Sequence, residues 1–130
     1  MIGAAIYGIL SGVSAITSLV STRIYPTVAP QNSTLPFITY STVTNTPNET
    51  KSGASKVDYI LIQFDVYGDT VLAVEGVTEA LRATLDFITP GTYNSIQIDG
   101  VSFRGERTLY EEDFEVHRKS IDFQFRIKYT

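Results

Sequence analysis

Hydrophobic and polar positions alternate strictly near the end of the chain. Residues 121–129 carry apolar side chains at odd positions and polar or charged ones at even positions, which predicts a half-buried β-strand. Residues 57–67 alternate in the same way and predict a second strand. Its core-facing side chains are Ile60, Ile62, Phe64 and Val66, and the opposite face carries Tyr59, Leu61, Gln63, Asp65 and Tyr67.

Two other segments have apolar residues at three- and four-residue steps, the period of an amphipathic helix. The first covers about the first twenty residues and is expected to break near Gly12. We expect its apolar side chains to pack against a sheet: Ile6, Ile9, Leu10, Val13 and Ile16. The second runs from Val71 to Ile88, with Asp69 or Thr70 as its N-cap and Thr89-Pro90-Gly91 as its stop.

Two further β segments complete the pattern. Residues 36–44 are rich in β-branched and aromatic side chains, and residues 96–103 continue an apolar alternation through a turn or bulge at Asp99-Gly100. The order helix, strand, strand, helix, strand, strand predicts an α+β fold. We expect one domain over residues 1–130, a mainly antiparallel sheet with the N-terminal helical segment and one central helix packed on one face.

The polar segment 45–55 has no apolar anchor, so we expect a long mobile loop. Two interpretations of it remain open. In one it is a subunit or docking contact, because residues that cannot pack on their own domain gain order against a partner. The contact residues would be Asn45, Asn48, Glu49, Lys51 and Lys56. In the other it is an ordinary hairpin loop without a role.

The first 22 residues carry no charged side chain, which raises the question of a signal peptide or a membrane span. No Lys or Arg precedes Arg23, and Gly and Ser residues interrupt the apolar run. Both features argue for a core-packing helix and against a membrane segment. A secreted chain that is cleaved after this segment is the alternative.

The chain offers little chemistry. Its 10 basic and 14 acidic residues give a net charge of −4, which argues against a broad phosphate-binding face. Cysteine is absent and His117 is the only histidine, so we expect no metal site, no cofactor and no catalytic residue. The acidic run lacks the spacing of a calcium loop and is expected to be a solvated turn: Glu111, Glu112, Asp113 and Glu115. A small ligand-binding domain or enzyme that uses carboxylates and tyrosines is the alternative.

Three runs carry a resemblance to a known family: 19–26 (Leu-Val-Ser-Thr-Arg-Ile-Tyr-Pro), 29–31 (Ala-Pro-Gln) and 35–40 (Leu-Pro-Phe-Ile-Thr-Tyr). Together they resemble the opening of tail completion, or tail-to-head joining, proteins of long-tailed bacteriophages and prophages. The resemblance implies a non-enzymatic virion protein at the head–tail junction, made in the bacterial cytoplasm. It implies a ring, typically a hexamer, that caps the tail tube protein and docks onto the head connector or stopper protein. DNA would pass through its centre without specific binding.

Overall fold

The computed structural model describes residues 2–50, 53–112 and 115–128, with side chains for all of these except 47–50, 53–56 and 111. Its helices are α1 (Ile2–Ser11), α2 (Ser14–Val20) and α3 (Val71–Leu85). Its strands are β1 (Ile24–Pro26), β2 (Phe37–Thr50), β3 (Gly53–Gly68), β4 (Gly91–Tyr93), β5 (Ile96–Glu111) and β6 (Val116–Lys128).

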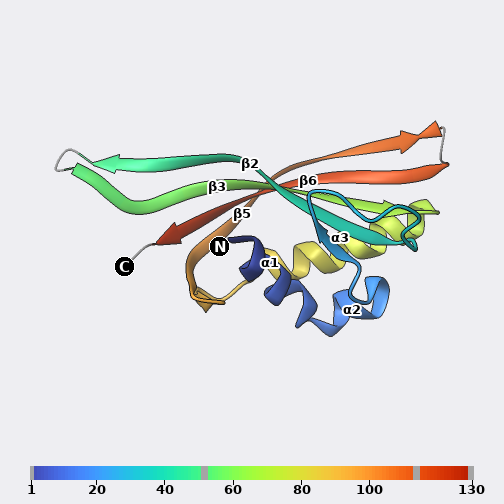
Figure 1. Cartoon of the computed structure of the whole chain (residues 1–130), viewed down its shortest axis with the longest axis horizontal. Coiled ribbons are helices and arrows are strands. Elements are labelled where there is room, and N and C mark those ends of the chain that lie inside the picture. Colours follow the sequence, from blue (N-terminus) through green and yellow to red (C-terminus); the bar gives the residue numbers. More distant parts are fainter. Residues whose placement is uncertain (1, 51–52, 113–114, 129–130) are drawn as a thin grey trace.

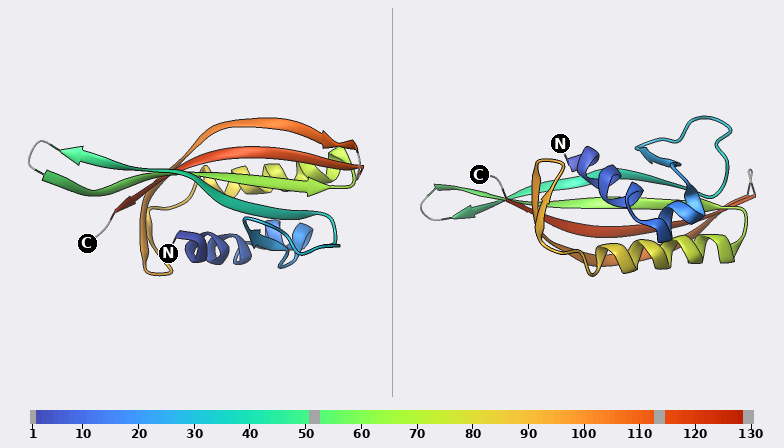
Figure 2. Two further views of the ribbon diagram at one scale, coloured as in Figure 1. Left: turned by 45° about the horizontal axis from the view of Figure 1, so that its top comes forward. Right: turned by 90° about the horizontal axis from the view of Figure 1, so that it is seen from below.

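The described strands form one six-stranded sheet in the order β1-β2-β3-β6-β5-β4. All neighbours are antiparallel except β1 and β2, which are parallel. The three helices lie on one face of this sheet and leave the opposite face bare (Figures 1 and 2). The α+β fold predicted from the sequence is therefore confirmed. We refer below to the helix-covered face and the bare face.

Strand register places the large apolar side chains opposite one another on the helix-covered face. Phe123 of β6 lies between Ile62 of β3 and Phe103 of β5, and its ring meets that of Phe64 edge-on at 5.7 Å. The predicted alternation in β3 and β6 is confirmed for the described residues, because the odd positions 121–127 of β6 and the even positions 60–66 of β3 are all buried. A one-residue slip would expose these rings and so cannot be tolerated.

The N-terminal helical segment breaks at Gly12 and Val13, as expected. Ile6, Leu10 and Ile16 are fully buried against the sheet, whereas Ile9 and Val13 are only partly buried. Among the described residues, no single helix is long and apolar enough to span a membrane. The pair α1 and α2 would reach that length and composition together, but the two helices are bent by 89°.

Helix α3 begins at the predicted cap: the Thr70 side chain accepts a hydrogen bond from the Ala73 amide at 3.1 Å. It ends at Leu85, three residues before the expected end at Ile88. Short β4, which follows it, was not predicted from the sequence. β4 pairs with the first residues of β5, Ile96 to Ile98.

The expectation of a long loop over residues 45–55 was wrong, because β2 continues to Thr50 and β3 starts at Gly53. The described backbone of this polar segment pairs largely across the two strands, which needs no apolar side chain. Among the described residues, Val57 is the last of β3 that pairs with β6, and beyond it β2 and β3 pair with each other. We call residues 48–50 and 53–56 the hairpin arm. It extends past the helices at one end of the molecule (Figure 1).

Candidate assembly surfaces

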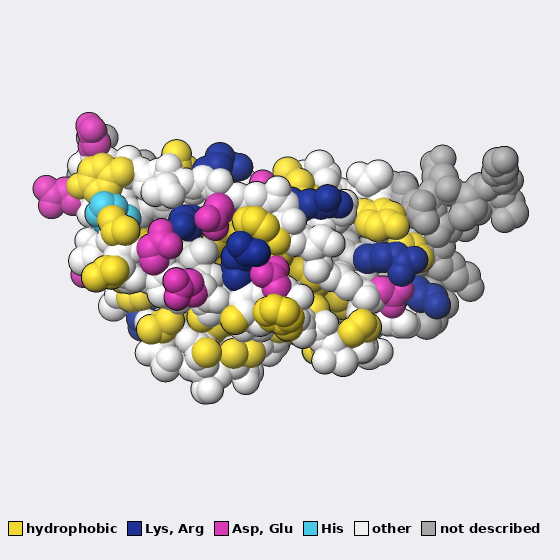
Figure 3. Space-filling view, turned by 180° about the vertical axis from the view of Figure 1, so that it is seen from behind, with side chains coloured by type: hydrophobic (Ala, Val, Ile, Leu, Met, Phe, Trp, Pro, Cys, Tyr) yellow, Lys and Arg dark blue, Asp and Glu magenta, His cyan; other side chains and the backbone are white. Residues whose placement is uncertain are grey.

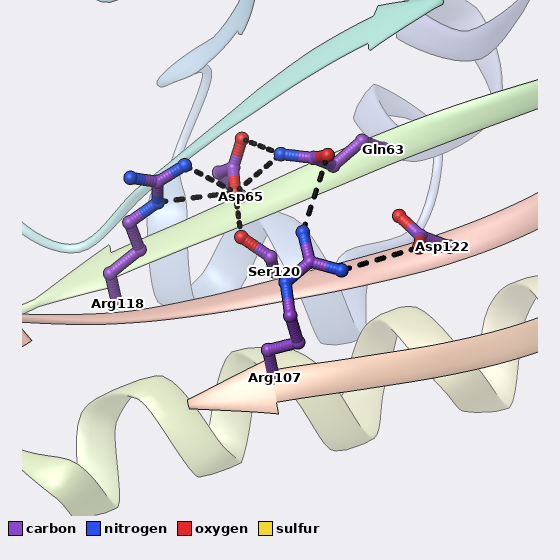
Figure 4. A network of polar contacts seen from close by, with 6 residues as sticks. All are labelled: Gln63, Asp65, Arg107, Arg118, Ser120 and Asp122. Atoms are coloured by element: carbon purple, nitrogen blue, oxygen red, sulfur yellow. Dashed lines mark hydrogen bonds and ion pairs between the residues drawn. The ribbon is translucent and has the colours of Figure 1, made fainter. Parts of the chain in front are cut away.

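A polar network crosses three strands on the bare face of the sheet (Figure 4). Its centre is Asp65, which is only 7% exposed although it lies opposite the hydrophobic core. Arg118 donates to the Asp65 carboxylate from Nε at 3.2 Å, and the buried Ser120 hydroxyl donates to the same oxygen. Gln63 donates to both carboxylate oxygens at 3.0 and 3.2 Å. These four donated hydrogen bonds replace the water that the Asp65 side chain loses on burial.

Two further ion pairs lie on this face. Arg107 lies 3.5 Å from Asp122, and Arg126 lies 2.9 Å from Asp99. Arg107 also reaches the Gln63 side chain at 3.5 Å, which links it to the Asp65 network. The side of the molecule shown in Figure 3 likewise has basic and acidic side chains interspersed. These arginines do not form a continuous basic patch, which non-specific phosphate binding would require.

One buried cation lies on the helix-covered face. The Lys119 side chain is 7% exposed; its Nζ lies 2.7 Å from Glu75 of α3 and 3.6 Å from Glu106 of β5. The hydrogen bond to Glu75 raises the pKa of Lys119, burial lowers it, and the charge of Glu106 raises it again; the net direction is upward. This triad ties α3 to the sheet at a position where the alternation of β6 would otherwise place an apolar side chain.

A shallow groove of about 690 Å³ lies between the β1–β2 connection and the bare face. The residues 27–33 and Leu35 form one wall, and Phe37, Thr39, Tyr67 and Val116 form the other. Phe37 and Tyr67 stack at 4.8 Å between ring centroids. At the base of the connection, Arg23 donates from Nε to the Pro36 carbonyl at 3.0 Å. The groove is mainly apolar and has no cluster of titratable side chains, so it offers no acid–base chemistry.

A family model described as "Tail completion protein gp17" matches residues 4–128. The chain belongs to this tail completion family. Comparison with curated proteins gave no match. A chain in a structure described as "Virion of native gene transfer agent (GTA) particle" is similar in fold, with a TM-score of 0.75, 19% identity, and coverage of 98% of this chain and 93% of that chain. A second solved structure has a TM-score of 0.63 and 16% identity over 99% of this chain and 94% of that one.

Membership of the tail completion family makes this chain a structural phage protein of the virion. The family is not normally enzymatic, and the described part of the chain holds no group of three or more His, Cys, Asp or Glu side chains that could bind a metal. The runs that carried the resemblance now have a structural meaning. Arg23 to Pro26 forms β1 and its approach, and β1 pairs in parallel with β2 at Ile38 to Tyr40.

The five predicted contact residues are all in or beside the hairpin. Asn45 is exposed on β2. The backbones of Asn48 and Glu49 belong to β2 and that of Lys56 to β3, while Lys51 lies outside the described residues. The pairing is irregular between Pro47 and Glu49, where Asn48 alone lies opposite three residues of β3, 55–57. The four described positions lie at one end of the sheet, and their role as a subunit or docking contact stays a prediction.

The other predicted surface groups lie at the opposite end. His117 is half-buried, and its ring lies 4.8 Å from that of Tyr110. Glu112 and Glu115 are exposed, and Asp113 lies outside the described residues. Neither the Asp65 network nor the Lys119 triad was predicted, because a buried polar residue on a strand follows the same alternation as an exposed one.

Proposed function

We propose that this tail completion protein forms a ring, a hexamer, at the junction of head and tail. The ring caps the tail tube, ends its growth, and docks the finished tail onto the head connector or stopper protein. The observation that carries the proposal is the family match over residues 4–128. The similarity in fold to a chain of a gene transfer agent virion supports it.

The charge distribution fits passage of DNA through the ring without specific binding. The chain has a net charge of −4, and three arginines of the bare face are held by Asp65, Asp99 and Asp122. A paired guanidinium releases fewer counterions from DNA than a free one, so the affinity for phosphate is low. A channel that grips phosphates would slow the DNA that must pass through it.

The test is to remove the protein and then restore it. In the phage or prophage that carries this gene, loss of the chain should give free, DNA-filled heads beside tails whose head-proximal end is uncapped. Addition of purified protein to such a lysate should restore joined particles, counted by electron microscopy. Normal joined virions in the absence of the protein would refute the proposal.

We further propose that the hairpin arm contacts a neighbouring subunit or the docking partner. Among the described residues, its two strands lie beyond the last pairing with β6 and pair with each other. An isolated two-stranded ribbon is marginally stable in water, and a partner surface would make up the difference.

Shortening the arm separates this role from folding. Replacing residues 48–56 by Asn-Gly leaves a three-residue connection between Pro47 and Asp58, which are paired in the sheet. We expect the melting temperature to change little, because loop closure differs by only about 1 kcal/mol, while head–tail joining is lost. A control of unchanged length, Glu49→Gln with Lys51→Gln and Lys56→Gln, tests whether the charges of the arm matter. Intact virions with the shortened arm would show that it is dispensable.

A further inference from the structure

Two long strand edges of the sheet are left without a partner by the described strands. β1 pairs with β2 only at Ile38 to Tyr40, so residues 41–50 of β2 have one free edge. β4 pairs with β5 only at Ile96 to Ile98, so residues 99–111 of β5 have another. We call these the β2 edge and the β5 edge. They lie on opposite sides of the sheet, because the order of strands runs from β2 to β5 (Figure 2).

Both edges are open to solvent on both faces as well. Five consecutive residues of β2, Thr42 to Thr46, are exposed, and so are five consecutive residues of β5, Glu106 to Tyr110. Val43, Leu109 and Tyr110 are 49%, 40% and 48% exposed although they are large and apolar. The stretch 41–46 carries no charge and is rich in β-branched residues. Free edges are normally protected by charges, prolines or covering elements. The stretch 41–46 has neither charge nor proline, whereas the β5 edge carries charges such as Arg104, Glu106 and Arg107. An edge without such protection can pair with another strand.

We propose that the β2 edge of one subunit pairs with the β5 edge of the next, so that the sheet continues around the ring; this inference rests on the proposed ring. The two edges differ and face opposite ways, which is the arrangement that a head-to-tail contact with rotational closure needs. Strand directions agree: β2, β3, β6 and β5 alternate in direction. The β2 strand of a neighbour rotated about the ring axis therefore runs antiparallel to β5.

The short outer strands set the limits of this contact. The β5 edge runs from residue 99, just past the pairing with β4, to Glu111 at the end of β5. Residues 41–50 of the neighbouring subunit's β2 are short enough to pair within this stretch. In that position β1 lies beyond the end of the neighbouring β5, and β4 lies beyond the tip of the neighbouring hairpin. Neither three-residue strand then blocks the pairing, and each acts as a stop that restricts its register.

The offset between the two edges agrees with the geometry of closed sheets. Within one subunit Asn45 lies level with Val101, through Ile60 and Phe125. Centring the neighbour's β2 edge on the β5 edge shifts the neighbouring subunit along the strand direction by about four to six residues, or ~14–20 Å. The four strands β2, β3, β6 and β5 that separate the two contacts are together ~19 Å wide. The resulting strand tilt is roughly 35–45°, the range that closure of a sheet into a barrel requires.

Engineered disulfides test the contact directly, because the chain contains no cysteine. Thr44 and Thr46 lie on the bare face, opposite Leu61 and Tyr59. Arg107 and Leu109 lie on the same face, opposite Ser120 and Arg118. Directly opposed side chains on one face have Cβ atoms about 4.5–5.5 Å apart, close to the reach of a disulfide. Four double variants, each joining one of Thr44→Cys and Thr46→Cys to one of Arg107→Cys and Leu109→Cys, cover the adjacent registers.

Rings assembled on tail tubes are oxidised mildly and run on a non-reducing gel. At least one double variant should give a ladder of covalent multimers up to the complete ring, reversed by reductant, while every single variant stays monomeric. The matched control, Thr44→Cys with Thr108→Cys, places the thiols on opposite faces, because Thr108 lies opposite Lys119; it should give no ladder.

Three outcomes overturn the inference in distinguishable ways. Intact rings in which no same-face pair cross-links place the subunit interface elsewhere and leave the proposed function standing. Covalent dimers from a single variant show like edges paired about a two-fold axis. Absence of rings in electron micrographs of the wild-type protein with tubes refutes the proposed function and this inference together.

Discussion

Arg23 donates a hydrogen bond from its guanidinium Nε to the backbone carbonyl of Pro36, 3.0 Å away. Arg23 immediately precedes β1 and Pro36 immediately precedes β2, and the Ile38 amide donates back to the Arg23 carbonyl at 3.0 Å. The side chain and backbone of Arg23 thus hold the starts of the two parallel strands β1 and β2 together. This explains in physical terms why an arginine stands before Ile24-Tyr25-Pro26.

Arg23→Ala should therefore destabilise the fold by about 1–2 kcal/mol, because a half-buried carbonyl loses a donor that carries a charge. Arg23→Lys should recover little of this, since an ammonium cannot reproduce the planar guanidinium geometry. Urea denaturation followed by circular dichroism gives both values. Arg104→Ala is the control: Arg104 is exposed and donates to the Gln124 side chain, so the change should stay within about 0.5 kcal/mol. Equal effects at positions 23 and 104 would contradict this interpretation.

A charge placed in α1 should distinguish its buried face from its exposed face. Leu10 is fully buried and Tyr7 is 37% exposed on the same helix. Leu10→Asp should cost several kcal/mol, because it buries an unpaired carboxylate and removes core packing. Tyr7→Asp should cost far less, and both are measured by thermal melting. Equal melting temperatures for the two variants would show that α1 does not pack as described.

The Lys119 triad should behave non-additively. Removing Glu75 or Glu106 alone leaves the buried ammonium one carboxylate, whereas the double change Glu75→Gln with Glu106→Gln leaves it none. The double variant should lose more stability than the sum of the single variants, by about 1–3 kcal/mol. Lys119→Met should be milder than the double variant, because the two carboxylates it leaves are 43% and 37% exposed. Strict additivity in a double-mutant cycle would count against the triad.

The pH dependence of the same triad has a defined sign. The pKa of Lys119 is raised in the folded protein, so the folded state binds its proton more tightly than the unfolded chain does. The resulting stabilisation is fully present below the unfolded pKa of about 10.4 and is lost as pH rises through the higher folded value. The stability difference between wild type and Lys119→Met should therefore be constant near neutral pH and shrink above about pH 10. A difference that grows with alkaline pH would have the wrong sign.

Side chains at the β5–β6 end should not be needed for chemistry. Glu112 is exposed and His117 contacts the ring of Tyr110. Glu112→Ala should be nearly neutral, and His117→Ala should cost at most about 1 kcal/mol through the lost ring contact. Counts of infectious particles should stay close to wild type for both. Particles that are assembled normally but have lost infectivity would point to a chemical role.

The sequence predicted those elements whose side chains alternate between core and solvent. β6 and the central part of β3 were predicted because a single register buries every apolar residue, and the break at Gly12 because the apolar period is interrupted there. The hairpin arm was misread as a loop, since its Thr, Asn and Ser residues owe their strand conformation to cross-strand backbone pairing. Asp65 illustrates a second limit: its burial depends on Arg118 and Ser120, which are more than fifty residues away.

Cryo-electron microscopy of purified virions is the most direct test of a ring at the head–tail junction. The six-stranded sheet, with three helices on one face, should fit one closed ring of density between the last tube layer and the head connector, repeated six times around the axis. Density for this fold at the tail tip, along the whole tube, or nowhere in the particle would contradict the proposal.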